Sequence, residues 1–399
     1  MTQPIKLSIR NILAGGDYTG TFMVGSPPQA VHLLLDTGSS ALGIKPSFYD
    51  PNKDTAKTIT NIGQQMLYGT GGWDGPVLKT TVTFAGEDQK GQALDVNVAI
   101  AYPTPENPHN FGEASGILGL AFRPLDNATR YFEQSNDHPV ATWPYDPAML
   151  EGAQRIPSQI DPFFSALEQA GVVANQFALY TLRSMVRHAG GDPAQDPANQ
   201  GYLILGGGEE FTDLYQGHFS AASIVHPAYY NTNLLEVTVG AGKPVSVAPP
   251  PNRFVVSNSI VDSGTNSLAL TKAVYDAIFA EFSAEQQRLI QAHTPAPGAL
   301  TLVPGDALDL SGWPTISFVL AGPSENVTLE VSPQTYWQTD TAIIGKKSFA
   351  SFGINDQGGP NSILGLPLLN NYFTIFDRSA PGHGRIMFAK IQPPASPAS

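Results

Sequence analysis

Along most of the chain, short apolar runs are separated by glycine, proline and other turn residues. In some runs apolar and polar residues alternate, and in others the apolar residues are continuous. Such runs predict β-strands joined by tight turns, because successive side chains of a strand point to opposite faces. Residues 18–44 predict a strand, a Gly-Ser-Pro-Pro turn and a second apolar strand that stops at Asp36. We therefore expect a carboxylate where a buried strand ends.

Other segments carry weaker signals. Residues 65–84 predict a hairpin whose glycine-rich tip, at 68–72, should be mobile. Residues 162–170 and 272–288 predict short helices. The stretch 123–160 is rich in proline, aspartate and asparagine and shows little periodicity, so we expect an irregular excursion there.

Length and composition indicate the fold class. The chain has 399 residues, and at about 100–200 residues per domain two or three folding units are expected. Its 39 Gly and 34 Pro, with 20 Phe and 14 Tyr, favour an all-β fold of short strands over long helices. A break rich in Gly, Pro and Asp at 183–201 separates two strand patterns. We expect an N-terminal lobe over 1–200, a C-terminal lobe over 201–399 and a disordered tail from about 392.

The absence of cysteine removes several kinds of chemistry. With no Cys, the chain has no disulfide framework, thiolate metal site, iron–sulfur cluster or cysteine nucleophile. The eight histidines are scattered and form no HExxH motif, so we expect no metal and no other cofactor.

The charge balance limits the kinds of partner that the protein is expected to bind. There are 21 Lys and Arg against 34 Asp and Glu, and the formal net charge of −13 repels nucleic acids and anionic membranes. No apolar run approaches the roughly 18 residues of a membrane-spanning helix, and the N-terminal segment lacks the apolar stretch of a signal peptide. We expect neither a nucleic-acid nor a membrane partner. A cytoplasmic location is expected, or a secreted or periplasmic one if the chain is a trimmed mature form.

The most informative feature is an internal repeat. The strand and turn VHLLLDTGSSALGI at 31–44 match NSIVDSGTNSLAL at 258–270. Each copy is followed by an apolar-apolar-Gly segment, at 117–119 and 363–365. Such self-similarity predicts two lobes related by a pseudo-twofold axis, at which the two Asp turns meet. A single Asp-Thr-Gly is most often only a turn, but two copies with matching downstream segments favour a paired site.

Together these motifs resemble the pepsin-like aspartic endopeptidases (pepsin family A1), most of all bacterial pepsin homologues without prosegment or disulfides. The glycine-rich hairpin at 68–71, the turn at 25–29 and the closing run at 370–389 also match that family. The resemblance implies an all-β bilobal fold of two β-barrel-like lobes with a few short helices. It also implies a monomeric endopeptidase that cleaves peptides or proteins at acidic pH and is inhibited by statine-type compounds such as pepstatin.

The resemblance assigns roles to both Asp turns. Two adjacent carboxylates cannot both ionise at acidic pH, so Asp36 and Asp262 should share one proton there and activate water between them. Glycine at the third position of each turn lets backbone amides approach the carboxylates, which a Cβ would hinder. The other turn residues should join the two loops and orient the carboxylate oxygens. These supporting residues are Thr37, Gly38 and Ser39 in the first copy and Ser263, Gly264 and Thr265 in the second.

Further residues are expected to contact the substrate. Tyr68, Gly69 and Thr70 at the hairpin tip would form a flap that closes over the peptide and excludes water. Five apolar residues are expected as subsite walls that favour bulky hydrophobic side chains around the cut bond, although core packing is the alternative for Ile117, Leu120 and Ile363. The walls are Leu34, Ile117, Leu120, Ile260 and Ile363.

Two departures from the family pattern keep an alternative open. The family has a tryptophan, hydrogen-bonded to the flap tyrosine, where this chain has Gly43, and Leu366 stands where an aspartate is usual. Trp73 could substitute by packing on the flap. A binding protein that keeps the carboxyl pair without turnover is the second hypothesis, because a misplaced flap would not close. A homodimeric retroviral-type protease is disfavoured, since one chain carries both motifs.

Overall fold

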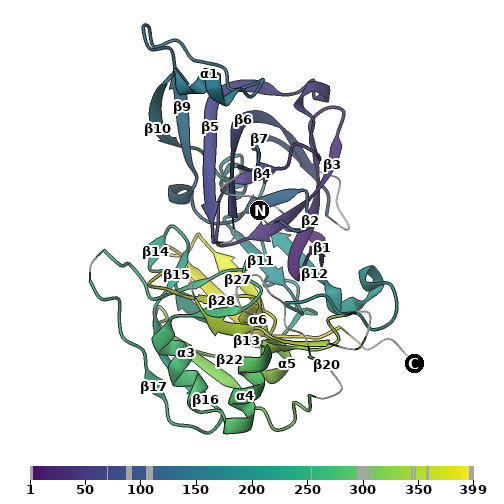
Figure 1. Ribbon diagram of the computed structural model, residues 1–399, viewed down its shortest axis with the longest axis vertical. Coiled ribbons are helices and arrows are strands. Elements are labelled where there is room, and N and C mark those ends of the chain that lie inside the picture. Colours follow the sequence, from purple (N-terminus) through teal and green to yellow (C-terminus); the bar gives the residue numbers. More distant parts are fainter. Residues whose placement is uncertain are drawn as a thin grey trace.

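The computed structural model describes the chain in two lobes, one above the other in Figure 1, and confirms the all-β bilobal fold. Thr70 and residues 395–399 of the expected tail lie outside the described residues. Gln392, where that tail was expected to begin, is held by hydrogen bonds: its N–H donates to Leu214 O (2.9 Å) and its carbonyl accepts from Tyr180 Oη (2.7 Å). The structure describes residues 3–69, 71–86, 92–104, 111–252, 254–293, 303–304, 308–342, 345, 347–355 and 359–394.

A six-stranded antiparallel sheet joins the lobes. Its order is β1-β12-β11-β27-β28-β13, so it combines strands from the start, the middle and the end of the given sequence. The lobe boundary expected between residues 200 and 201 falls at the start of β12, inside this sheet. The bounds are β1 (Ile5–Ala14), β12 (Gln200–Leu205), β11 (Gln176–Tyr180), β27 (Tyr372–Asp377), β28 (Arg385–Ile391) and β13 (Tyr215–Ser223).

The same sheet continues into the first lobe, where six strands close on themselves. The order β2-β3-β8-β4-β7-β6 is completed by a pairing of β6 with β2, which makes a barrel. Strand β5 pairs with β6 as the predicted hairpin, with Tyr68 opposite Gly71 at its tip. The bounds are β2 (Asp17–Val24), β3 (Gln29–Asp36), β4 (Leu42–Ile44), β5 (Thr58–Tyr68), β6 (Gly71–Phe84), β7 (Gln92–Ile100) and β8 (Gly116–Gly119).

The stretch 123–160 is more regular than its sequence suggests. Strands β9 (Asn127–Phe132) and β10 (Gln154–Gln159) pair antiparallel and extend the sheet beyond β5. Helix α1 (Pro147–Glu151) lies between them, capped by Asp146. The expectation of an irregular excursion was wrong. Strand β10 is the edge strand and is largely exposed, and β9 beside it has only one buried residue, so neither strand needs alternating apolar residues.

The second lobe is built from three smaller sheets. The sheet that carries Asp262 has the order β14-β15-β18-β26-β19-β25, and the others are β17-β16-β21-β22 and β20-β24-β23. The bounds are β14 (His226–Pro227), β15 (Tyr230–Thr232), β16 (Leu234–Val239), β17 (Val245–Ser246), β18 (Ser259–Val261), β19 (Leu268–Leu270), β20 (Val303–Pro304), β21 (Ile316–Leu320), β22 (Val327–Val331), β23 (Trp337–Gln338), β24 (Lys347–Ala350), β25 (Phe352–Ile354) and β26 (Ser362–Leu364).

Helices are few and short. Helix α2 (Phe163–Gln169) confirms the first predicted helix. The single helix expected over 272–288 is instead two, because Ser283 and Gln286 exchange hydrogen bonds as a capping box that starts a new helix. In the described part of the chain no helix is long and apolar enough to cross a membrane. The remaining helices are α3 (Lys272–Phe279), α4 (Ala284–His293), α5 (Pro333–Tyr336) and α6 (Leu366–Leu369), with 3₁₀ turns η1 (Pro51–Lys53), η2 (Arg123–Leu125), η3 (Pro193–Gln195) and η4 (Pro197–Asn199).

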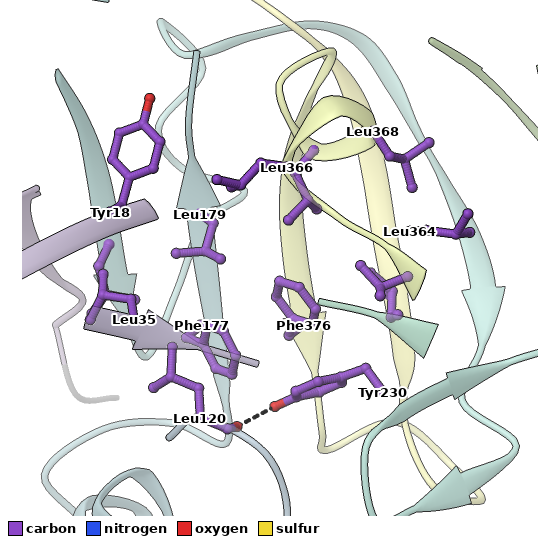
Figure 2. Close-up of a cluster of buried hydrophobic side chains, with 14 of the residues drawn as sticks. Tyr18, Leu35, Leu120, Phe177, Leu179, Tyr230, Leu364, Leu366, Leu368 and Phe376 are labelled. Carbon is purple, nitrogen blue, oxygen red and sulfur yellow. Dashed lines mark hydrogen bonds between the residues drawn. The ribbon is translucent and has the colours of Figure 1, made fainter. Parts of the chain in front are cut away.

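A shared apolar core lies between the lobes. Figure 2 shows Leu120 of the first lobe, Phe177 and Phe376 of the central sheet and Tyr230 of the second lobe in one cluster. The rings of Phe177 and Phe376 stack with centroids 4.8 Å apart, and the Tyr230 hydroxyl donates to Leu120 O at 2.8 Å. This core fixes the lobes against each other beneath the ends of β3 and β18.

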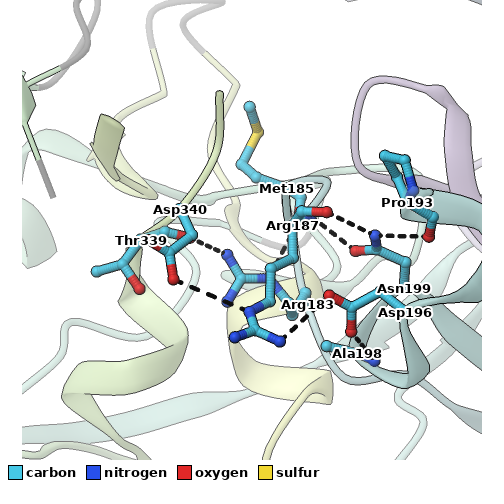
Figure 3. A network of polar contacts seen from close by, with 9 residues as sticks. All are labelled: Arg183, Met185, Arg187, Pro193, Asp196, Ala198, Asn199, Thr339 and Asp340. Carbon is cyan, nitrogen blue, oxygen red and sulfur yellow. Dashed lines mark hydrogen bonds and ion pairs between the residues drawn. The ribbon is translucent and has the colours of Figure 1, made fainter. Parts of the chain in front are cut away.

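The segment between β11 and β12 is tied to the second lobe. Figure 3 shows Arg187 between two carboxylates, Asp196 at 3.2 Å and Asp340 at 3.9 Å, with Arg183 beside Thr339. Burial lowers the pKa of Arg183 to about 10, so the guanidinium remains charged. The break at 183–201 is therefore anchored and does not act as a free linker.

Candidate active site

Two matching strand arrangements carry the two Asp turns. In the first lobe β3 runs parallel to β8, which pairs antiparallel with β4. In the second lobe β18 runs parallel to β26, which pairs antiparallel with β19. Asp36 is the last residue of β3, and Asp262 directly follows β18. The internal repeat is therefore a repeat of structure, and it brings both carboxylates to one place between the lobes.

The two turns exchange hydrogen bonds across the lobe boundary. The Thr37 hydroxyl accepts from Ser263 N (2.8 Å) and donates to Val261 O (3.1 Å). Symmetrically, the Ser263 hydroxyl accepts from Thr37 N (3.1 Å) and donates to Leu35 O (2.8 Å). All four bonds involve buried groups, so the relative position of the two carboxylates is rigidly set.

Each carboxylate is oriented by its own turn. Asp36 accepts from Gly38 N at 2.7 Å and from the Ser39 hydroxyl at 2.5 Å. Asp262 accepts in the same way from Gly264 N at 2.9 Å and the Thr265 hydroxyl at 2.6 Å. The donors contact equivalent oxygens in both turns, so the pair is symmetric in its hydrogen bonding.

The third residue of each turn must be glycine because the opposite carboxylate lies against it. A Cβ on Gly38 would lie 2.6 Å from Oδ1 of Asp262, and one on Gly264 would lie 2.4 Å from Oδ1 of Asp36. Cβ atoms do not make contacts this short. The two glycines therefore allow the carboxyl groups to approach each other.

Burial and the neighbouring carboxylate make Asp36 a weaker acid than usual. Both carboxylates are about 7% exposed. Desolvation, followed by the charge of Asp262, raises the pKa of Asp36 well above its usual range, and the hydrogen bonds from Ser39 and Gly38 oppose this shift only in part. Such a pair holds one proton between its members at acidic pH.

A cleft of about 500 Å³ opens above the pair. Four of the five predicted wall residues line it, namely Leu34, Ile117, Ile260 and Ile363. Leu120 does not, which corrects that prediction. It is fully buried in the core of Figure 2, because the chain turns away from the cleft after β8.

Some residues that line the cleft belong to none of the sequence motifs. Phe111, Tyr229 and Asp17 are among them, and sequence analysis missed all three. Phe111 contacts Tyr68 edge to face, with ring centroids 6.1 Å apart. Asp17 starts β2 just before Tyr18, and only the pairing of β2 with β3 could have indicated its place.

The hairpin tip covers the cleft. Tyr68 and Gly69 line it, whereas Thr70 lies outside the described residues. Burial raises the pKa of Tyr68 above its usual range, so its hydroxyl stays protonated. The Trp73 indole donates a hydrogen bond from Nε1 to the Tyr68 hydroxyl at 3.1 Å.

The position of Trp73 also explains why residue 43 is a glycine. A Cβ on Gly43 would lie 2.9 Å from Cζ2 of Trp73, so the indole occupies the space beside this glycine. Trp73 is 1% exposed and packs with the cleft residues Leu34 and Ile117. The tyrosine is therefore supported from its own hairpin, and Gly43 does not leave it without a partner.

The described residues include no group of three His, Asp or Glu side chains that could hold a metal ion. The candidate chemistry of the cleft rests on the two carboxylates. The comparison with known proteins agrees, since the family model for eukaryotic aspartyl proteases matches residues 17–391. The chain belongs to the aspartyl protease family. The predicted resemblance to pepsin family A1 is thereby confirmed.

Curated relatives of this aspartyl protease cover nearly all of its length. It is 23% identical to beta-secretase of Strongylocentrotus purpuratus, over 99% of this chain and 71% of that protein. It is 25% identical to cathepsin D of Gallus gallus (98% and 84% covered) and 25% identical to pepsin A of Gallus gallus (91% and 82% covered). The protein is thus an aspartic endopeptidase acting on peptides, a class that pepstatin inhibits.

Proposed function

We propose that Asp36 and Asp262 are the catalytic residues and that they cleave peptides at acidic pH with a water molecule as nucleophile. The observation that carries this proposal is the symmetric carboxyl pair, held by hydrogen bonds between the lobes and open to a peptide-sized cleft. The geometry suits general acid–base catalysis without a covalent intermediate.

The steps follow from the shared proton. The ionised carboxyl removes a proton from water while the oxygen of that water bonds to the carbonyl carbon of the peptide. The protonated carboxyl donates its proton to the carbonyl oxygen, which gives a neutral tetrahedral diol. The carboxyl that took the water proton then donates it to the peptide nitrogen, and the other carboxylate takes a proton from a diol hydroxyl as the C–N bond breaks. The products are a carboxylic acid and an amine. The pair again holds one proton.

Acidic pH keeps one proton on the carboxyl pair. When both carboxyls ionise, the acid that polarises the carbonyl is lost, so activity should fall as pH rises above the upper pKa of the pair. The raised pKa of Asp36 supports an upper limit well above that of an ordinary aspartate.

The cleft supports a preference for bulky hydrophobic residues around the cut bond. Leu34, Phe111, Ile117, Ile260 and Ile363 provide apolar walls on both sides of the carboxyl pair. Tyr68 would close over the bound peptide and exclude water. We also infer that the chain acts as a monomer, because one chain supplies both carboxyls.

The test is hydrolysis of a quenched fluorescent peptide with hydrophobic residues at the cut bond, followed from pH 3 to 7. Asp36→Asn and Asp262→Asn should each lower kcat/KM by at least about 100-fold, the lower range for loss of an acid–base group. Asp95→Asn, which removes an exposed carboxylate outside the cleft, is the matched control. Pepstatin binding, measured as a rise in Tm, checks that the cleft of each variant is folded. Undiminished cleavage by either cleft variant would refute the assignment.

A further inference from the structure

A third carboxyl faces the same cleft. Asp17 lines it together with Asp36 and Asp262. Strands β2 and β3 pair antiparallel with Thr19 opposite Leu34. Extending this register by two residues puts Asp17 beside Asp36 on the same face of the sheet.

One carboxyl oxygen of Asp17 has no hydrogen-bond partner among the described residues. Its Oδ1 is buried and accepts no hydrogen bond within the described part of the chain. Burial, then the charges of Asp262 and Asp36, raise the pKa of Asp17 well above its usual range. Buried carboxyl oxygens are nearly always paired, so one left unpaired at the wall of a substrate cleft indicates a missing donor.

The cleft supplies no cation of its own. Among the described residues that line it there are three aspartates and no Lys, Arg or His. A cation placed against Asp17 would offset the repulsion from the other two carboxyls and favour its ionised form. The apolar walls at Leu34, Phe111 and Ile117 could hold the aliphatic stem of a long basic side chain.

We propose that Asp17 is a specificity-determining residue that binds a substrate side chain ending in an ammonium or guanidinium group. The basic group donates a hydrogen bond to Oδ1 of Asp17, while hydrophobic residues occupy the positions at the cut bond. This inference rests on the proposed function, since it concerns the substrate of that same cleft. The preferred substrates are peptides that contain lysine or arginine.

The experiment compares matched peptides that differ in one charge. A hydrophobic quenched peptide carries lysine, acetyl-lysine or methionine in turn at each of three positions on either side of the cut bond. At one position the wild type should cleave the lysine peptide about tenfold faster in kcat/KM than the acetyl-lysine peptide, as expected for a hydrogen bond to a charged group. A ratio below about threefold at every position would overturn the inference.

Variants then assign the effect to Asp17. Asp17→Asn keeps the shape and removes the charge, so the ratio for lysine over acetyl-lysine should fall to about one. Glu113→Gln removes an exposed charge close to Phe111 but outside the cleft lining, and should leave the ratio as in the wild type. The ratio of kcat/KM for the lysine peptide over the acetyl-lysine peptide does not depend on the fraction of active enzyme. Asp17→Ser provides a second variant if Asp17→Asn folds poorly. A ratio that survives both substitutions of Asp17 would refute the assignment.

The two proposals fail in different ways. If the proposed function is wrong, the methionine peptides are not cleaved by the wild type, or their cleavage does not depend on Asp36. If only the role of Asp17 is wrong, these peptides are cleaved normally and the lysine preference is absent or unrelated to Asp17.

Discussion

Replacing Trp73 by phenylalanine should slow peptide cleavage because it removes the hydrogen bond that holds the flap tyrosine. The indole Nε1 lies 3.1 Å from the Tyr68 hydroxyl, and Trp73 is 1% exposed. A hydrogen bond of this kind contributes about 0.5–1.5 kcal/mol. If the bond is needed to place Tyr68 over the substrate, kcat/KM should fall by about twofold to tenfold.

A double-mutant cycle separates this bond from general damage. Tyr68→Phe removes the other partner of the same bond, so the double variant should be only slightly worse than either single variant. The coupling free energy, taken from kcat/KM of a quenched peptide, should be about 1 kcal/mol.

Trp337→Phe is the matched control. Trp337 is equally buried, but its Nε1 has no hydrogen-bond partner within the described residues, so this substitution reports the loss of packing alone. Losses that simply add in the Trp73 and Tyr68 double variant would refute the reasoning, as would an equal loss of activity in the control.

Three further outcomes follow from the site and its surroundings. Gly264→Ala should abolish cleavage, since its Cβ would lie 2.4 Å from Oδ1 of Asp36; wild-type turnover would contradict this. Thr37→Val leaves the buried N–H of Ser263 without an acceptor, so the free energy of unfolding in urea should fall by about 1–3 kcal/mol, and an unchanged urea midpoint would count against the lobe contact. Burial raises the pKa of Asp126 to about 8, so protonation of this carboxyl favours the folded state. This contribution to the free energy of unfolding is complete below the pKa of Asp126 in the unfolded chain and is lost as pH rises towards 8. Asp126→Asn should therefore reduce the fall of Tm between about pH 4 and pH 8, and a Tm profile parallel to the wild type would exclude this role.

The parts of the site that depend on local turns were predictable. Asp36 and Asp262 were placed correctly at strand ends, because an apolar strand followed by Asp-Thr/Ser-Gly is a short-range signal that occurs twice. The hairpin was predicted over 65–84 because glycines mark its tip, and the structure extends it to 58–84. Local sequence thus located both turns and the hairpin whose tip lines the cleft.

Other features depend on contacts between distant residues. Sequence analysis offered Trp73 as a support for Tyr68, but the space that Gly43 leaves for the indole depends on a contact between two different strands. Asp17 faces the cleft because of the register between β2 and β3, which leaves no mark in the residues around it. Leu120 was misassigned because an apolar residue at the end of a strand can face either a cleft or a core. The split between α3 and α4 depends on the capping pair Ser283 and Gln286, which the helical pattern concealed.

The central sheet also determines when the enzyme can become complete during its synthesis. Strand β11 needs β27 as a neighbour, with Gln176 opposite Asp377, and β27 is synthesised long after β11. Until then the nascent first lobe exposes an open strand edge, which can pair wrongly with other chains. The same late segment brings β26, and with it the support of the second Asp turn. A growing chain therefore has no assembled carboxyl pair until β26 and β27 have been added.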